Sequence, residues 1–432
     1  MSLINEIMSY QNILEATKRV KSNKGAPGVD EMPVDEIESY IKEHYEEIKE
    51  QVLNKKYKPQ SVRRVYIPKA NGKKRPLGIP TVVDRVIQQA ISQVLSPIYE
   101  NYFSDYSYGF RPNRDCHKAM NKVLEYINEG YTYIIDVDIE KYFDTVNHDK
   151  LISILRERMN DSTTLHLIRS FLKAGVMENG LISPSTEGVP QGGPLSPLLS
   201  NIYLDKLDKE LEYRGLRFVR YADDFNILVK SKDSAKRVKE SVTSWLERKL
   251  FLKVNAEKTK IVRPKDSEFL GFGFWKKGEV WRLIPLDSRK ERLKGKIKQT
   301  LIRKQAIARP LSETFTKLNQ IIIGWINYYK ISDMRKFLNE LGGWLRHKVR
   351  VVIIKQWKRP RTIYKNLRKI RDIINSSISN KEILGIANAR QGLYRMCCHK
   401  IINFLLSPKV LATRKGDRPG LVNPLKYYLS KV

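Results

Sequence analysis

The sequence predicts an α+β fold in which strands and helices mix through the first two thirds and helices dominate the last third. The strongest strand signal is FVRYADDFNILV at residues 218–229. Its two apolar runs flank a Tyr-Ala-Asp-Asp core, which is typical of an antiparallel hairpin. Apolar residues at helical spacing indicate long helices, among them residues 34–53, 81–99 and 233–250. From Asp287 the spacing becomes helical, which favours a mixed body followed by a helical domain.

Composition places the chain among globular proteins of two or three domains. Its 432 residues are 41% hydrophobic, which is enough for a sizeable core. Since no apolar run is long enough to cross a bilayer and no apolar signal-peptide block is present, we expect no membrane span and no secretion. The three cysteines lack the paired spacing of structural zinc, although Cys397, Cys398 and His399 leave an isolated metal site as an alternative. We therefore expect a cytoplasmic protein.

The net charge of +33 is concentrated in the C-terminal third. Residues 275–432 hold 37 lysines and arginines against 9 acidic residues, whereas residues 1–274 hold 43 against 38. Such a basic region indicates a polyanionic partner. A solvated basic surface and a membrane-binding face are the alternatives. The charges are spread among tryptophans and tyrosines and are not gathered in one short tail, which favours nucleic acid.

The N-terminal part of the chain predicts helices, an ordered loop and a basic hairpin. NKGAPGVD at 23–30 separates a first helical segment from the helix at 34–53, and its glycines and proline predict a loop of fixed shape. SVRRVYI at 61–67 alternates as a strand, and an Asn-Gly turn follows. The basic residues around this turn are Lys69, Lys73, Lys74 and Arg75. A basic hairpin tip suits a triphosphate, because arginine donates to two oxygens at once, while a basic solvent-exposed loop is the alternative.

Residues 131–151 predict a half-buried strand, an aromatic pair and a helix. Asp136 and Asp138 share one face of the strand, and Asp138 lies where the strand ends. Asn147 is placed to cap the helix, and we interpret His148 in its first turn as structural. Asp136 has no catalytic role in this interpretation.

Two glycine-containing loops precede predicted helices. SYGFRP at 107–112 leads into a helix that starts near Asn113, and EGVPQGGPLSPLL at 187–199 leads into one that starts at Pro194. Gln191 directly precedes the glycine pair of the second loop. Glycines let a backbone approach a ligand closely, and helix N-terminal amides favour phosphate, so this loop is a candidate binding segment.

Asp223 and Asp224 are the strongest candidates for chemistry. The flanking strands place them at the edge of a core, where unpaired carboxylates repel each other and are poorly solvated. A divalent cation removes both problems, and Mg²⁺ takes oxygen ligands while keeping positions open for phosphate. Asp138, at the end of a strand that can neighbour the hairpin, would complete a site for two Mg²⁺ ions. The alternative is that the Asp-Asp pair only makes a turn.

Three motifs in this order resemble the palm motifs of reverse transcriptases: DIEKYFDTVNHDKL, GVPQGGPLSPLLSNIYLDKLDKEL and RYADD. Further segments resemble one branch, the bacterial group II intron-encoded reverse transcriptases. These segments are NKGAPGVD, IPKANGKKRPLGIPTVVDRVIQQA, SYGFRP, FLGFGF and GWINYY. The resemblance runs continuously over residues 10–360. The lack of DNA-binding and endonuclease extensions resembles the compact class C type of this branch.

The resemblance implies a right-hand polymerase fold with fingers, a palm built on an antiparallel sheet and an α-helical thumb. Residues 1–60 would form an N-terminal extension with a template-clamping loop. Residues 61–284 would form the fingers and palm. Residues 285–432 would form the basic thumb, or maturase domain, and a C-terminal tail.

The resemblance also assigns roles to individual residues. The matches to the catalytic, metal-binding acids are Asp138, Asp223 and Asp224. The matches to the dNTP contacts are Lys69 and Arg75 on the triphosphate, Gln191 beside the incoming nucleotide and Tyr142 as the aromatic gate under the sugar. Many relatives have phenylalanine at this last place.

The implied activity is RNA-directed DNA synthesis on an RNA template, with a DNA or RNA primer and dNTPs as substrates. Family members often also bind intron RNA and assist splicing and mobility. One alternative is a splicing cofactor that only binds RNA, against which the intact set of acids and dNTP contacts argues. Another is a related bacterial reverse transcriptase serving defence, diversification or repair, against which the full thumb and GWINYY argue.

Overall fold

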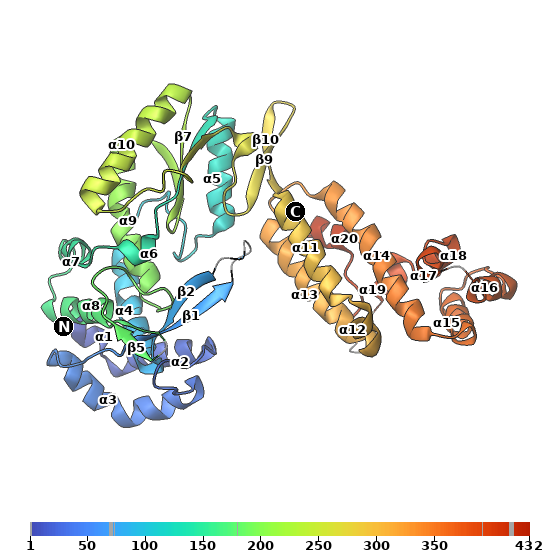
Figure 1. Cartoon of the computed structure of the whole chain (residues 1–432), viewed down its shortest axis with the longest axis horizontal. Coiled ribbons are helices and arrows are strands. Elements are labelled where there is room, and N and C mark those ends of the chain that lie inside the picture. Colours follow the sequence, from blue (N-terminus) through green and yellow to red (C-terminus); the bar gives the residue numbers. More distant parts are fainter. Residues whose placement is uncertain (1, 69–71, 73, 179, 391, 414–418) are drawn as a thin grey trace. The chain divides into compact units, whose positions relative to one another are not determined.

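The computed structural model describes residues 2–68, 72, 74–178, 180–390, 392–413 and 419–432 (Figure 1). The chain forms two compact units, Met1–Ser267 and Glu268–Val432. Sheets and helices both occur, which confirms the α+β class. The domain boundary expected after residue 284 falls inside the second unit. Within the described part of the chain, no helix has the length and apolar character needed to cross a membrane.

The first unit combines two sheets with the helices that cover them. Its elements are α1 (Leu3–Ile7), α2 (Tyr10–Ser22), η1 (Val34–Glu36), α3 (Ile37–Leu53), β1 (Val62–Pro68), β2 (Lys74–Ile79), α4 (Val82–Glu100), α5 (Cys116–Asn128), β3 (Tyr133–Val137), α6 (Tyr142–Thr145), α7 (His148–Arg156), α8 (Ser162–Lys173), β4 (Val176–Glu178), β5 (Leu181–Ser183), α9 (Ser196–Tyr213), β6 (Arg217–Tyr221), β7 (Asp224–Val229), α10 (Lys232–Leu250), β8 (Lys260–Val262) and η2 (Pro264–Asp266).

The central sheet of this unit has the strand order β6-β7-β3-β8, and each of its pairings is antiparallel. Side chains alternate between its two faces. The core-facing side chains are Ile135, Val137, Phe218, Phe225, Ile227 and Val229. Helix α10 packs against β3 and β7, and α5 packs against β6. Because these strands are anchored in the core, groups at their ends are held at the rim of a packed sheet.

The second sheet has the order β2-β1-β4-β5, with β1 and β2 forming the predicted hairpin. The predicted loop at 23–30 docks on the start of α4. Arg85 Nη2 donates to the Ala26 carbonyl at 2.8 Å, and a Cβ on Gly28 would lie 2.6 Å from Thr81 Cα. The close approach explains why a glycine stands at position 28.

Two helices begin later than predicted, whereas Asn147 caps α7 as predicted by accepting from Lys150 N at 2.8 Å. Helix α5 begins at Cys116, because Asn113 has a left-handed φ of 58° and Asp115 supplies the N-cap. Helix α9 begins at Ser196, whose hydroxyl donates to the Pro190 carbonyl at 2.6 Å and closes the loop before the helix.

The second unit is a hairpin followed by packed helices. Its elements are β9 (Phe272–Lys277), β10 (Val280–Pro285), α11 (Asp287–Thr300), α12 (Arg303–Ala308), α13 (Leu311–Tyr329), α14 (Arg335–Trp357), α15 (Pro360–Ile373), α16 (Asn380–Ala387), α17 (Leu393–Met396), α18 (Lys400–Leu405), α19 (Pro408–Ala412) and α20 (Pro424–Leu429). Helix α13 packs against α11 and α20, and α14 packs against α12 and α20. The helices α15 to α20 follow α14 in the C-terminal tail, where the sequence pattern is least legible.

Candidate active site

The tip of the β6–β7 hairpin carries the two adjacent acids, as predicted. The last strand pair is Tyr221 with Asp224, so Ala222 and Asp223 form a two-residue turn. Ala222 has a φ of 60°, and a positive φ at the first turn position matches the right-handed twist of the hairpin. Asp223 therefore lies at the tip, and Asp224 is the first residue of β7.

Asp138 lies beside this tip. Strand β3 pairs with β7 up to Val137 and Phe225, and continuing that register by one residue places Asp138 opposite Asp224. Opposed residues of antiparallel strands have Cβ atoms about 5 Å apart. The Asp138 backbone is held on its other side, because its N–H donates to Thr259 Oγ1 at 3.2 Å and its carbonyl accepts from Asn255 N at 2.8 Å.

The acids at this rim influence one another electrostatically. Burial raises the pKa of Asp223, Arg75 lowers it, and the charge of Asp138 raises it further. Part of the Asp224 side chain is exposed to solvent. The surrounding protein nevertheless desolvates its carboxylate, which raises its pKa. The carboxylates of Asp136, Asp223 and Asp138 add to this effect, and the Asp224 pKa reaches about 7.

These side chains fit a divalent cation in their chemistry. Three carboxylates crowd one rim, and each gains from a positive charge between them. Within the residues that the structure describes, however, no three His, Cys, Asp or Glu side chains are gathered closely enough to hold a metal ion. Asp138 Oδ2 instead accepts from Lys258 Nζ at 3.1 Å. A cation that binds Asp138 through this oxygen would therefore have to replace the ammonium group of Lys258.

Of the predicted triphosphate contacts, Arg75 is brought toward the acids. It lies in β2 opposite Ile67 of β1, its side chain is exposed, and its charge acts on Asp223. Lys69, the other predicted contact, lies outside the described residues, as does Lys73.

The loop that carries Gln191 lies against the strand that carries Arg75. The Gln191 carbonyl accepts from Gly78 N of β2 at 2.7 Å. A Cβ on Gly192 would overlap the Gly78 carbonyl, and one on Gly193 would overlap the Gln88 side chain. Of the glycine pair that was predicted to approach a ligand, Gly192 is thus already required by backbone packing within the protein, whereas Gly193 faces the mobile end of a side chain.

His148 holds the same loop from the other side and is structural, as predicted. It is buried, and its Nε2 lies 2.7 Å from the Gly188 carbonyl. Burial lowers its pKa, so the neutral imidazole is favoured.

Tyr142 is not placed where the sugar gate was expected. It is only 2% exposed, and its hydroxyl donates to the Ser200 carbonyl at 3.1 Å. Its neighbour Phe143 lines a cavity of about 500 Å³ together with Gln191. The reason is the short helix α6, in which successive side chains point in different directions, so Tyr142 enters the core and Phe143 faces the cavity.

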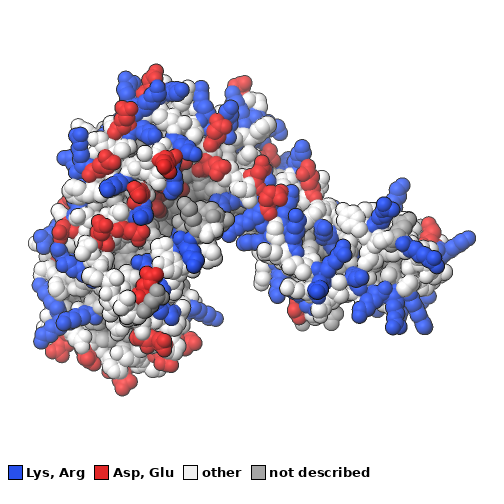
Figure 2. All heavy atoms as spheres, viewed as in Figure 1, with Lys and Arg blue, Asp and Glu red and all other residues white. Residues whose placement is uncertain are grey.

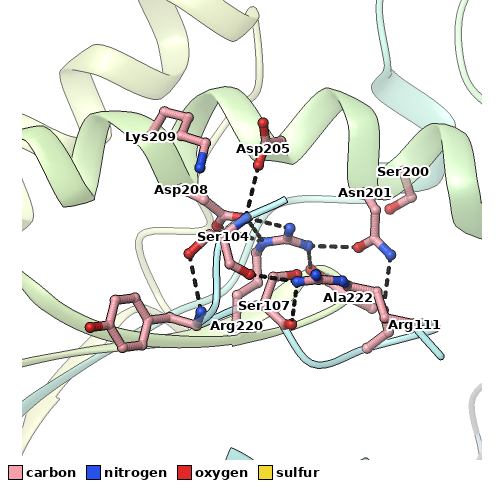
Figure 3. A network of polar contacts seen from close by, with 12 residues as sticks. Ser104, Ser107, Arg111, Ser200, Asn201, Asp205, Asp208, Lys209, Arg220 and Ala222 are labelled. Atoms are coloured by element: carbon pink, nitrogen blue, oxygen red, sulfur yellow. Dashed lines mark hydrogen bonds and ion pairs between the residues drawn. The ribbon is translucent and has the colours of Figure 1, made fainter. Parts of the chain in front are cut away.

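The sequence interpretation missed a buried polar network behind the tip (Figure 3). Its centre is Arg220, which bonds to Asp208 and Asn201 of α9 and to the Ala222 carbonyl. A signal was present, because Arg220 alternates with Phe218 and so shares its core-facing side. A charged residue on a core face requires a buried partner.

Two family models match the chain. The reverse transcriptase (RNA-dependent DNA polymerase) model matches residues 67–274, and the group II intron maturase-specific domain model matches residues 290–374. The first match covers the tip acids, Asp138, Arg75 and Gln191. The second lies entirely within the second unit.

Curated proteins similar to this chain include one named as a group II intron-encoded protein. Protein YkfC of Escherichia coli (strain K12) is 36% identical over 310 residues, which covers 62% of this chain and 81% of YkfC. Group II intron-encoded protein LtrA of Lactococcus lactis is 33% identical over 331 residues, covering 61% of this chain and 54% of LtrA. The putative COX1/OXI3 intron 2 protein of Saccharomyces cerevisiae is 35% identical over 258 residues, with 59% and 29% covered. With both domains matched in order, the chain belongs to the group II intron-encoded reverse transcriptase and maturase family.

Proposed function

We propose that this chain copies RNA into DNA by template-directed phosphoryl transfer, at a site built from Asp138, Asp223 and Asp224. The observation that carries the proposal is the strand register, which sets Asp138 across from Asp224 at the rim where burial and the neighbouring acids raise the pKa of Asp224. Acids so placed are suited to hold cations next to a triphosphate.

Two Mg²⁺ ions, when bound, would make the primer 3′-hydroxyl a better nucleophile and neutralise the leaving oxygens. Asp223 and Asp224 would hold them from the hairpin tip, and Asp138 from the neighbouring strand. A cation held by Asp138 Oδ2 would displace Lys258, whose ammonium group would then be free to contact a phosphate. Phosphoryl transfer requires little covalent work from the protein, so the rigid placement of these groups is its main contribution.

The dNTP would lie between the tip and the β1–β2 hairpin. Arg75, whose charge already acts on Asp223, would hold the β- and γ-phosphates together with Lys69. Gln191 would lie beside the base and sugar. We assign the sugar gate to Phe143 and not to buried Tyr142, since Phe143 is the aromatic residue that lines the cavity with Gln191.

In the right-hand arrangement that we propose, the two sheets of the first unit correspond to palm and fingers. The helices of the second unit correspond to the thumb, and residues 1–60 to an extension whose loop at 23–30 clamps the template. The docking of this loop on α4 through Arg85 supports a fixed position for the loop.

We also propose that the chain binds the RNA of its own group II intron and assists its splicing. The maturase-specific match and the excess of basic residues in the second unit support this role. A splicing assay beside primer extension, on one protein preparation, separates the two activities. Splicing without extension would leave only the RNA-binding role.

The decisive experiment is extension of a DNA primer on an RNA template with Mg²⁺. We expect Asp223→Asn and Asp224→Asn each to abolish extension while RNA binding persists, because each substitution removes a cation ligand and leaves the second unit intact. Asp233→Asn, an exposed acid in the first turn of α10, is the matched control and should extend normally. Full extension by both tip variants would refute the site.

A further inference from the structure

Arg220 is a fully buried charge two residues before the tip. Its side chain is 0% exposed, as is that of its partner Asp208 in α9. Arg220 Nε donates to Asp208 Oδ1 at 2.7 Å, and Nη2 donates to Oδ2 of the same carboxylate. A bidentate pair of this kind satisfies the buried charge, so Nη1 is not needed for the Asp208 contact.

Nη1 is directed at the turn that carries the catalytic acid (Figure 3). It donates to the Ala222 carbonyl at 2.9 Å and to Asn201 Oδ1 at 3.0 Å. The Ala222 carbonyl belongs to the peptide bond that leads into Asp223. Since a peptide unit is planar, holding this oxygen also fixes the direction in which the chain enters Asp223.

The turn is enclosed from its other side by the segment 106–109. Tyr108 N donates to the Arg220 carbonyl, and Asn201 Nδ2 donates to the Gly109 carbonyl, both at 2.9 Å. A Cβ on Gly109 would overlap Ala222 N, so this backbone lies directly against the turn. Ala222 adopts a left-handed φ of 60°, which is unfavourable for alanine and needs such support.

Helix α9 connects this support to the other parts of the site. It begins directly after the loop that carries Gln191, and its Ser200 carbonyl accepts from the Tyr142 hydroxyl at 3.1 Å. Asn201 and Asp208, the partners of Arg220, lie on the same helix. Helix α9 therefore adjoins three parts of the site, namely the Asp223 turn, the segment that follows Asp138 and the Gln191 loop.

We propose that Arg220 is a positioning residue whose bond to the Ala222 carbonyl aims the Asp223 carboxylate at the cation. This inference rests on the proposed function. The alternative is a purely stabilising ion pair, since a buried pair of charges can often be replaced by apolar residues without loss of stability. A stabilising role does not require contact with the turn, whereas positioning does.

The test uses the full chain and three variants. Arg220→Met with Asp208→Leu removes both charges together and so avoids a stranded buried charge. Arg220→Lys keeps the charge but cannot span Asp208 and Ala222 with a single ammonium group. The control is Arg214→Met with Glu210→Leu, which removes a partly buried arginine pair of the same helix α9 (Nε–Oε1 2.8 Å) that does not touch the turn. Mn²⁺ affinity is measured by electron paramagnetic resonance without substrate, and kcat and KM by primer extension.

For the Arg220/Asp208 double variant we expect Mn²⁺ affinity and kcat each to fall by about tenfold to about hundredfold, as for loss of a charged hydrogen bond. KM for dNTP should change much less, because the lost contact orients a cation ligand and not the nucleotide. Arg220→Lys should lose part of the same affinity, and the control should retain wild-type values. If the double variant does not fold, the Mn²⁺ affinity, kcat and KM of Arg220→Lys test the positioning role instead.

Wild-type Mn²⁺ affinity in a folded Arg220 variant, or an equal loss in the Arg214 control, would overturn the positioning role. Failure of the proposed function has a different signature, namely that Asp223→Asn still extends primers. An inactive Asp223→Asn beside a normal Arg220 variant refutes only the role of Arg220.

Discussion

The two units of this protein differ in their balance of basic and acidic residues and in where these residues lie. Residues 1–267 include 43 basic and 37 acidic side chains, whereas residues 268–432 include 37 and 10. In the first unit a basic and an acidic side chain, Arg220 and Asp208, are paired completely out of solvent. In the second unit α15 has exposed basic residues, opposite its buried Ile363 and Leu367, namely Arg361, Lys365, Arg368 and Lys369. Figure 2 shows basic and acidic side chains intermingled on the visible face of the first unit and basic ones prevailing on the second.

This difference indicates which function each unit is suited to. Buried, bidentate charge pairs fix geometry, which a site for phosphoryl transfer requires. Exposed cations with few acidic neighbours attract a phosphate backbone over a broad surface without demanding one geometry. The same kind of substitution should therefore have different effects at a buried charge pair and at an exposed cation.

The largest effect is expected from removing one member of the buried pair. Asp208→Ala leaves Arg220 charged and unpaired in the core, which should lower the free energy of unfolding of the first unit by about 3–5 kcal/mol. Arg361→Ala on exposed α15 should change stability by less than about 0.5 kcal/mol. Denaturant unfolding of both variants measures the two changes in the free energy of unfolding. Equal losses of stability would contradict the distinction between the units.

Next in size is the loss of RNA affinity when exposed charges of the second unit are neutralised. Replacing Arg361, Lys365 and Arg368 by Gln should weaken RNA binding on the order of 100-fold at about 0.1 M salt and reduce the salt slope by about 2. The control neutralises three exposed cations of α10 in the first unit, Lys232, Lys236 and Arg237. Equal effects of the two triple variants, in filter binding over a salt series, would contradict a dedicated RNA surface on the second unit.

Two glycine substitutions, one in each unit, test the same contrast through smaller changes in stability. Gly109→Ala should cost about 1–3 kcal/mol of stability, because the added Cβ meets the backbone of the catalytic turn. Gly295→Ala, inside α11 with no atom within 4 Å of its added Cβ, should instead stabilise by about 0.5–1 kcal/mol. Thermal unfolding of the two variants checks the opposite signs. A stabilised Gly109→Ala would show that the turn is not tightly enclosed.

The smallest expected effect concerns pH. The Asp224 pKa is about 7, raised by burial and by neighbouring acids, so below pH 7 a proton occupies the carboxylate that a cation needs. The half-saturating Mg²⁺ concentration in primer extension should rise by up to about tenfold from pH 7 to pH 6 and should level off above pH 8. RNA binding, followed at the same pH values, should stay nearly constant. A half-saturating concentration that is the same at pH 6 and pH 8 would speak against Asp224 as a ligand.

Much of the fold follows from local patterns. The hairpin at the tip, the cap at Asn147 and the long helices depend on alternation, helical spacing and capping, which act over short stretches of chain. The errors concern two helix starts and one side-chain direction. Helices α5 and α9 start later than predicted, because Asp115 caps the first and Ser196 closes a loop onto Pro190 before the second. The Tyr142 side chain enters the core, where its hydroxyl donates to the Ser200 carbonyl of another helix.

The amino-acid sequence by itself determined which acids are candidates, which third of the chain is basic and to which family the motifs point, because these properties are carried by residue type and local order. Only the tertiary structure decided that Arg220 pairs with Asp208, that Lys258 reaches Asp138 from a distant part of the chain, and that Phe143 and not Tyr142 lines the cavity. These outcomes depend on which segments meet in space. The hydrophobic core sets that arrangement, and no local pattern records it.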